Sequence, residues 1–176
     1  MGKIISMEIR ETFVNGLGIA VDRVYREGVD PVQEPKGVLI QGIAGVDTFC
    51  FYGDKMVVVF DGKKKYWGPP KGGVEPHETF EEAVVREVKE EANMKVLHQE
   101  LIGFVDFYIH ENVIRTTRNV EVFCIVEPYG DFVSDPDDDI TEIKLIDPSD
   151  YKQYFDWGNG GDHVIKRAIE LKDKKT

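Results

Sequence analysis

The chain has 176 residues, 41% of them hydrophobic, and a formal net charge of −11 at pH 7. This length and apolar content predict one globular domain that buries a core without disulfides or a structural metal. The negative charge disfavours a nucleic-acid partner, because contacts to a phosphate backbone need clustered lysine and arginine. A small phosphate-bearing molecule stays compatible with this charge where divalent cations lie between the two sets of negative groups.

Signals for a membrane or for secretion are missing from the sequence. No apolar run has the length of a membrane span, and the first eight residues become charged too early for a signal peptide. The two cysteines, Cys50 and Cys124, each lie inside an apolar run, which is typical of buried free thiols. We therefore expect a cytoplasmic protein with no membrane partner.

Residues 1–40 carry the weakest pattern. Apolar and polar residues alternate weakly over 4–14 and 17–24, and a loop rich in Gly, Pro and acidic residues follows. We therefore divide the chain into an N-terminal extension, residues 1–40, which is either an extra strand pair or an oligomerisation arm, and a main domain, residues 41–176. A homodimer formed through the extension is compatible with the pattern, but no residue decides it.

The main domain begins with a predicted hairpin. Two β-prone runs, 46–52 and 56–60, flank the turn dipeptide Gly53-Asp54. A second turn then leads to a loop rich in Gly and Pro at 68–73.

A helix is predicted next, over residues 80–92. Thr79 followed by Glu82 forms a capping-box pattern at its start, and Asn93 lies where a left-handed terminator is expected. Strands over 101–109, 113–126 and 140–146 and a helix over 162–172 complete the chain. This order predicts an α/β (α+β) fold, with helices covering both faces of a mixed sheet.

Three carboxylates share one face of the predicted helix. Glu87, Glu90 and Glu91 have the spacing i, i+3 and i+4, so at about 100° per residue they project from one side. No lysine lies on that sector to offset their repulsion. The spacing alone leaves two interpretations open: a solvated acidic face, or a site for a hard divalent cation.

The segment from Gly72 to Met94 resembles the Nudix box. The family pattern is Gly, five residues, Glu, seven residues, Arg-Glu, an aliphatic residue, any residue, Glu-Glu, any residue, Gly and an aliphatic residue. The matching positions are Gly72, Glu78, Arg86, Glu87, Val88, Glu90, Glu91 and Met94. Asn93 replaces the last glycine, a mild departure because Asn is the best non-glycine residue for a left-handed helix end. The resemblance implies a MutT-like hydrolase with the Nudix fold, an α/β/α sandwich with a mixed sheet between helices.

The resemblance also implies roles for single residues. It implies that Glu87, Glu90 and Glu91 bind the catalytic Mg²⁺, with Mn²⁺ as the alternative cation, and that backbone carbonyls at Lys71 and Gly72 complete the shell. It implies a structural ion pair between Glu78 and Arg86, and these two residues complete the predicted catalytic set.

The general base stays open at the level of sequence. It is either a glutamate of the box or a later acid, for which the candidates are Asp137, Asp138, Asp139 and Glu142. A run of aspartates after a proline is also typical of a solvated turn.

The expected substrate is a small nucleoside diphosphate linked to another moiety, which the enzyme hydrolyses at the pyrophosphate linkage. Candidate substrate-binding residues are Lys71, Tyr66, Trp67, Arg115 and Arg118, although each is also compatible with plain surface charge or core packing. The alternative function is a nucleotide-sensing domain that keeps the fold without turnover. The intact set of box glutamates weighs against it.

Overall fold

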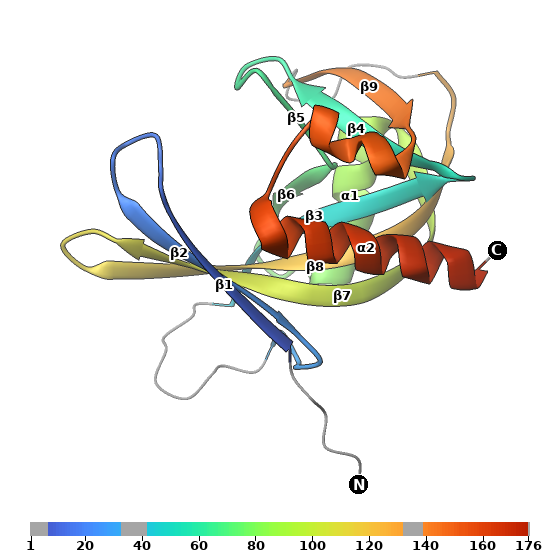
Figure 1. Ribbon diagram of the computed structural model, residues 1–176. Coiled ribbons are helices and arrows are strands. Elements are labelled where there is room, and N and C mark those ends of the chain that lie inside the picture. Colours follow the sequence, from blue (N-terminus) through green and yellow to red (C-terminus); the bar gives the residue numbers. More distant parts are fainter. Residues whose placement is uncertain (1–6, 33–41, 132–138, 176) are drawn as a thin grey trace, which may run out of the picture.

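The computed structural model describes residues 7–32, 42–131 and 139–175 (Figure 1). The strands over these residues are β1 (Met7–Val14), β2 (Ala20–Glu27), β3 (Ile43–Tyr52), β4 (Lys55–Asp61), β5 (Tyr66–Gly68), β6 (Lys71–Gly73), β7 (Met94–His110), β8 (Ile114–Pro128) and β9 (Ile140–Ile146). The helices are α1 (Phe80–Ala92), the 3₁₀ helix η1 (Pro148–Gln153) and α2 (Gly158–Lys175). No described helix has the length and apolar character needed to cross a membrane.

The strands form one mixed sheet. Their order is β1-β2-β7-β8-β3-β4-β5, with β6 paired to β3 and β9 paired to β4. β3 and β8 run parallel, whereas the other described pairs are antiparallel. Most of β3 and the middle of β8 are buried on both faces, which explains why these parts of the sequence are mainly apolar.

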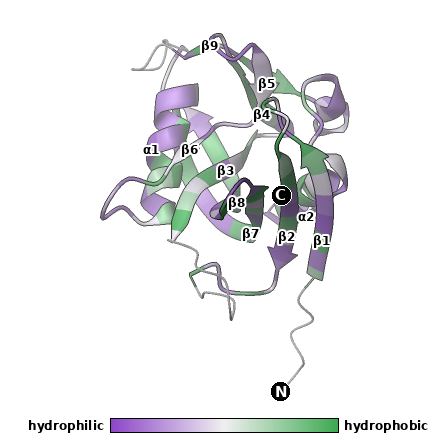
Figure 2. Ribbon diagram, turned by 90° about the vertical axis from the view of Figure 1, so that its left-hand side faces the viewer, coloured by the Kyte–Doolittle hydropathy of each residue, from purple (hydrophilic) through white to green (hydrophobic). Residues whose placement is uncertain are grey.

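Two hydrophobic cores lie on the two faces of this sheet. Val84 and Val88 of α1 pack with Cys50 and Val122 in one core, and α2 packs over the other core, which contains Phe49, Phe51, Phe123 and Val164. Figure 2 shows hydrophobic and hydrophilic stretches alternating along α1, as expected of a helix with one buried face. The arrangement is an α/β/α sandwich, which confirms the predicted fold class.

Both predicted ends of the first helix are confirmed. The Thr79 hydroxyl accepts from the Glu82 N–H at 3.2 Å, and the Glu82 carboxylate accepts from the Thr79 N–H at 2.9 Å. Asn93 has φ 51° and ψ 43°, and its N–H bonds to the Lys89 carbonyl at 3.0 Å. Local sequence specifies this helix, because both caps come from residues beside it.

Helix α2 begins before the predicted start, at Gly158 instead of Asp162. The carboxylate of Glu11, on β1, accepts from the Asn159 N–H at 2.8 Å and from the Gly160 N–H at 3.2 Å. A capping residue so far away in sequence satisfies the free N–H groups of the first turn. The local pattern around residue 160 therefore could not place this helix start.

The first two strands join the sheet of the rest of the chain. β1 and β2 pair as an antiparallel hairpin, and β2 also pairs with β7. Glu27 at the end of β2 accepts from His163 of α2 at 2.8 Å and forms an ion pair with Arg167 at 3.2 Å. The predicted division at residue 40 falls outside the described residues, and an oligomerisation arm stays a prediction.

Candidate active site

A short turn joins the glycine-rich strand β6 to the acidic helix α1. β6 pairs with β3, with Gly72 opposite Val46 and Gly73 opposite Gly45. The turn then reaches Thr79 and the helix. This strand–turn–helix unit places the backbone of Lys71–Gly73 beside the acidic face of α1.

Arg86 is the centre of an ion-pair cluster on this unit. Its Nε and Nη2 donate to the two oxygens of Glu78, each at 2.9 Å, and Nη2 also donates to the Gly73 carbonyl at 2.7 Å. Its Nη1 donates to Glu87 at 2.6 Å and to Glu90 at 3.3 Å. The hydrogen bonds from Arg86 hold the pKa of Glu78 below its usual value, and the Glu78 and Glu87 carboxylates raise the pKa of Arg86. The guanidinium thus joins loop and helix.

Glu87 is the most buried acid of this cluster. The residue is 8% exposed, and burial raises the pKa of its carboxyl. The carboxylate occupies the space where a side chain at residue 72 would lie, so a Cβ on Gly72 would overlap it. Glycine is required here for close approach of the strand to the helix.

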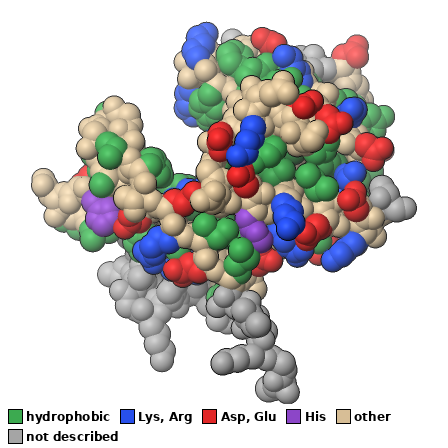
Figure 3. All heavy atoms as spheres, in the orientation of Figure 1, with side chains coloured by type: hydrophobic (Ala, Val, Ile, Leu, Met, Phe, Trp, Pro, Cys, Tyr) green, Lys and Arg blue, Asp and Glu red, His purple; other side chains and the backbone are tan. Residues whose placement is uncertain are grey.

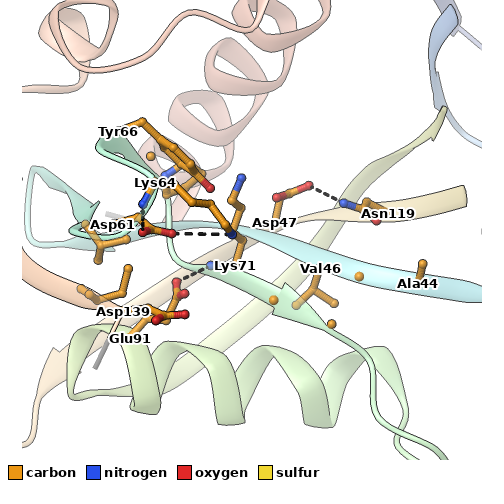
Figure 4. A pocket seen from close by; sticks show the side chains of 17 residues that line it. Ala44, Val46, Asp47, Asp61, Lys64, Tyr66, Lys71, Glu91, Asn119 and Asp139 are labelled. Carbon is orange, nitrogen blue, oxygen red and sulfur yellow. Dashed lines mark hydrogen bonds and ion pairs between the residues drawn. The ribbon is translucent and has the colours of Figure 1, made fainter. Parts of the chain in front are cut away.

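Glu91 faces a cleft beside the cluster. Its Oε2 accepts from the Lys71 N–H at 2.8 Å. The cleft has a volume of about 300 Å³, and its polar lining includes Asp47, Asp61, Lys64, Tyr66, Glu91 and Asp139. Figure 4 shows Glu91 beneath the Lys71 backbone, with Asp61 and Asp139 on one side and Asp47 and Asn119 on the other.

This geometry agrees with a family comparison. The family model described as the NUDIX domain matches residues 44–168. The chain belongs to the Nudix family. The match confirms the expectation from the Gly72–Met94 segment and makes this chain a Nudix hydrolase.

Solved structures share its fold at low sequence identity. A mutant of the Bacillus subtilis pyrophosphohydrolase RppH has a TM-score of 0.64 at 16% identity, covering 92% of this chain and 97% of that one. A MutT of Aliivibrio salmonicida and Vibrio cholerae has a TM-score of 0.53 at 20% identity, covering 73% and 98%. An ADP compounds hydrolase has a TM-score of 0.52 at 16% identity, covering 97% and 95%. None of the curated proteins matches the chain.

Hydrogen bonds from other groups of the protein hold the three glutamates Glu87, Glu90 and Glu91. Arg86 engages Glu87 and Glu90, and the Lys71 N–H engages Glu91. Across the described ranges, no three acidic, His or Cys side chains already converge on a point where a metal ion would bind. Hard oxygen donors are nevertheless the ligands that Mg²⁺ prefers, and three carboxylates with the carbonyls of β6 form such a set. The residues therefore fit a divalent cation by donor chemistry.

Of the predicted substrate-binding residues, Lys71 and Tyr66 line the cleft of the Nudix hydrolase. The Lys71 ammonium lies 4.9 Å from the Tyr66 ring and 5.4 Å from the Trp157 ring. Burial lowers the pKa of Lys71, but Asp47, Tyr66 and Glu91 together outweigh it, so the pKa is raised and the amine stays charged. Trp67 instead packs against Phe60, with ring centroids 5.2 Å apart, outside the lining of the cleft.

The two predicted arginines do not reach the cleft. Arg118 is 1% exposed, and its Nε and Nη2 donate to the two oxygens of Asp106 at 2.7 and 2.8 Å. A buried guanidinium needs a carboxylate partner, and Asp106 is that partner for Arg118. Arg115 is exposed beyond the turn between β7 and β8, where it pairs with Glu111 at 3.1 Å. The structure therefore places both arginines outside the lining of the cleft, each paired with an acid of the chain.

The described candidates for the general base lie at different places in the structure. Asp139 lines the cleft and forms an ion pair with Lys63. Glu142 lies on β9 opposite Phe60, is exposed, and is absent from the cleft lining. Asp137 and Asp138 fall outside the described residues. Of the two later acids that the structure describes, Asp139 is the one that lines the cleft.

The sequence interpretation missed a group of polar residues on the central strands. Asp47 on β3 lies opposite Glu121 on β8, and the two residues are 6% and 1% exposed. Asn119 Nδ2 donates to Asp47 at 3.3 Å. The available signal was an acidic residue inside each otherwise apolar, strand-forming run, since acids are rarely buried there without a role.

Proposed function

We propose that this Nudix hydrolase cleaves, with Mg²⁺, the pyrophosphate linkage of a small molecule in which a nucleoside diphosphate is joined to another moiety. The observation that carries the proposal is the Arg86 cluster, which gathers Glu78, Glu87 and Glu90 against Gly73 beside the cleft that Glu91 lines. Acids assembled this way are costly without a counter-charge, and one arginine offsets only part of their charge.

The residues divide the work of phosphoryl transfer between them. Glu87, Glu90 and Glu91 would hold the cation, which supplies positive charge against the diphosphate oxygens when bound. The charged Lys71 side chain binds phosphate oxygens at the border of the cleft. Asp139 accepts the proton of the attacking water, and Arg86 keeps Glu87 in position. Mn²⁺ is the expected substitute cation, because it takes the same oxygen ligands.

Two further observations support a small phosphorylated substrate. The names of two structures with this fold, a pyrophosphohydrolase and an ADP compounds hydrolase, fit cleavage of a phosphoanhydride. On the face drawn in Figure 3, basic and acidic side chains of the described residues are interspersed and do not gather into a basic stripe, unlike the surface that binds a nucleic-acid backbone. The cytoplasm remains the proposed location, in line with the two buried free thiols Cys50 and Cys124.

The test is release of phosphate or nucleoside monophosphate from a panel of diphosphate-containing metabolites, with Mg²⁺, Mn²⁺ or EDTA. We expect turnover only with a metal. Glu91→Gln should lower turnover by about 100-fold and weaken Mg²⁺ binding without unfolding the protein, because it removes a ligand charge. Glu81→Gln, an exposed acid of the same helix, serves as the matched control.

Two results would contradict the proposal. Activity that survives Glu91→Gln or EDTA would remove the cation from the mechanism. A wild-type protein that binds Mg²⁺ and nucleotides tightly but hydrolyses no panel member would favour the nucleotide-sensing function.

A further inference from the structure

A second cavity adjoins the catalytic cleft. Its volume is about 510 Å³, which lies within the range of small-molecule sites. Asp47, Lys71 and Asn119 line both this cavity and the cleft that Glu91 lines. Because the two share these walls, one ligand can place its diphosphate in the cleft and its remaining part in the second cavity.

One buried oxygen in the second cavity has no hydrogen-bond partner in the described part of the chain. Glu121 is 1% exposed and lines the cavity. Its Oε1 lies 4.0 Å from Nη2 of Arg23, whereas its Oε2 has no hydrogen-bond partner among the described residues. Burial raises the pKa of Glu121, and the nearby Asp47 carboxylate raises it further. A buried acceptor left unpaired costs free energy that a ligand donor would recover.

The nearby cations of the chain are already engaged by other groups. Nη1 of Arg23 donates to the Trp157 carbonyl at 3.0 Å and to Glu11 at 3.4 Å. The Lys71 ammonium is stabilised by the Asp47 carboxylate. The cavity therefore offers acceptors in excess and selects a ligand that brings its own N–H donors.

Three aromatic side chains form part of the remaining lining. Phe13, Phe107 and Trp157 line the same cavity as Glu121. Aromatic faces stack on planar rings, and hydrogen bonds to the ring edge decide which ring is held. A flat ring with N–H groups on one edge matches both features.

We propose that this second cavity holds the base of the substrate nucleotide and that Glu121 selects guanine by accepting a hydrogen bond from its edge. Guanine carries a ring N–H and an exocyclic amino group side by side, so its donors face an acceptor-rich wall. Adenine and uracil place ring or carbonyl acceptors beside their donor, and these acceptors would lie against the unpartnered Oε2 acceptor of Glu121. The inference rests on the proposed function for the diphosphate half of the substrate.

The experiment measures binding of guanosine, inosine, adenosine and uridine 5′-monophosphates to the full chain in EDTA, by titration calorimetry. We expect guanosine monophosphate to bind about tenfold more tightly than inosine monophosphate, which lacks the amino group. Glu121→Gln should remove this preference. In the glutamine variant the amide oxygen should face the Arg23 guanidinium, because an NH₂ there would meet another donor, so the cavity meets an NH₂ donor in place of an acceptor.

Glu127→Gln changes an exposed residue of the same strand and is the matched control. Equal wild-type affinity for the four nucleotides, or an unchanged preference in a folded Glu121→Gln protein, would overturn the assignment. The wild-type series alone tests it if the variant does not fold. Base preference in EDTA together with absent metal-dependent turnover would overturn only the proposed hydrolysis, so the two proposals fail separately.

Discussion

The carboxylate of Glu87 lies directly against the backbone of Gly72, in the space that a Cβ at residue 72 would fill. Gly72→Ala should therefore displace Glu87 and lower turnover by about 100-fold, because a displaced ligand loses cation affinity. Gly73→Ala is the control, since a Cβ there meets only the Ala44 carbonyl, at 3.7 Å. Turnover and Mg²⁺ titration of both variants check this. Equal activity of the two alanine variants would contradict it.

Arg86 holds its partners through several N–H groups at once, which a lysine cannot reproduce. Arg86→Lys should lower turnover by about tenfold or more and the free energy of unfolding by about 2 kcal/mol, because the paired bonds to Glu78 and the bond to Gly73 are lost. Urea denaturation and steady-state kinetics measure both effects. Arg115→Lys, at an exposed pair, should change neither.

Arg118 supports the fold and not the substrate. Arg118→Leu should lower the free energy of unfolding by about 3 kcal/mol, because Asp106 stays buried and, among the described residues, keeps only its 2.7 Å pair with Arg26. Thermal and urea unfolding of the variant measure this loss. A stable Arg118→Leu protein with a raised KM would instead return Arg118 to the substrate site.

The contact between Glu27 and α2 predicts a stability that depends on pH. Burial raises the pKa of Glu27, but hydrogen bonds from His163 and Tyr25, together with the charges of Arg167 and His163, outweigh it, so the folded pKa lies below the ordinary 4.5. A carboxyl with a lowered folded pKa stabilises the protein above its unfolded pKa, and this contribution is lost as pH falls through the folded value.

Wild type should therefore exceed Glu27→Gln in free energy of unfolding at neutral pH, with a difference that shrinks below pH 4.5. Urea unfolding at a series of pH values measures the difference, with the exposed Glu111→Gln as control. A difference that grows in acid would show that Glu27 is not stabilised as a carboxylate.

The features that could be predicted from the sequence are those that residues close together in the chain determine. The caps Thr79 and Asn93 lie beside α1, so both of its ends were predictable. The start of α2 was not, because Glu11 supplies its N–H acceptors from the other end of the chain. Arg118 looked available for a substrate because no local pattern reveals that Asp106, on another strand, neutralises it.

The catalytic half of the site could be predicted for the same reason, since one strand–turn–helix unit carries it. The second cavity could not. Asp47 and Glu121 meet only through the parallel pairing of β3 with β8, and their separation in sequence hides that contact. Single acids within apolar runs were the available indication.

The parallel pairing of β3 with β8 also bears on the order in which the folding chain gains its ligand sites. These strands are separated in sequence by β4, β5, β6, α1 and β7, so pairing them closes a long loop. The entropy cost of closing this loop favours a late step in folding. The β7–β8 hairpin and α1 depend on closer contacts and can form earlier. Because both cavities take walls from β3 and β8, a chain stalled before that pairing would contain the Nudix helix but have neither cavity to hold a nucleotide.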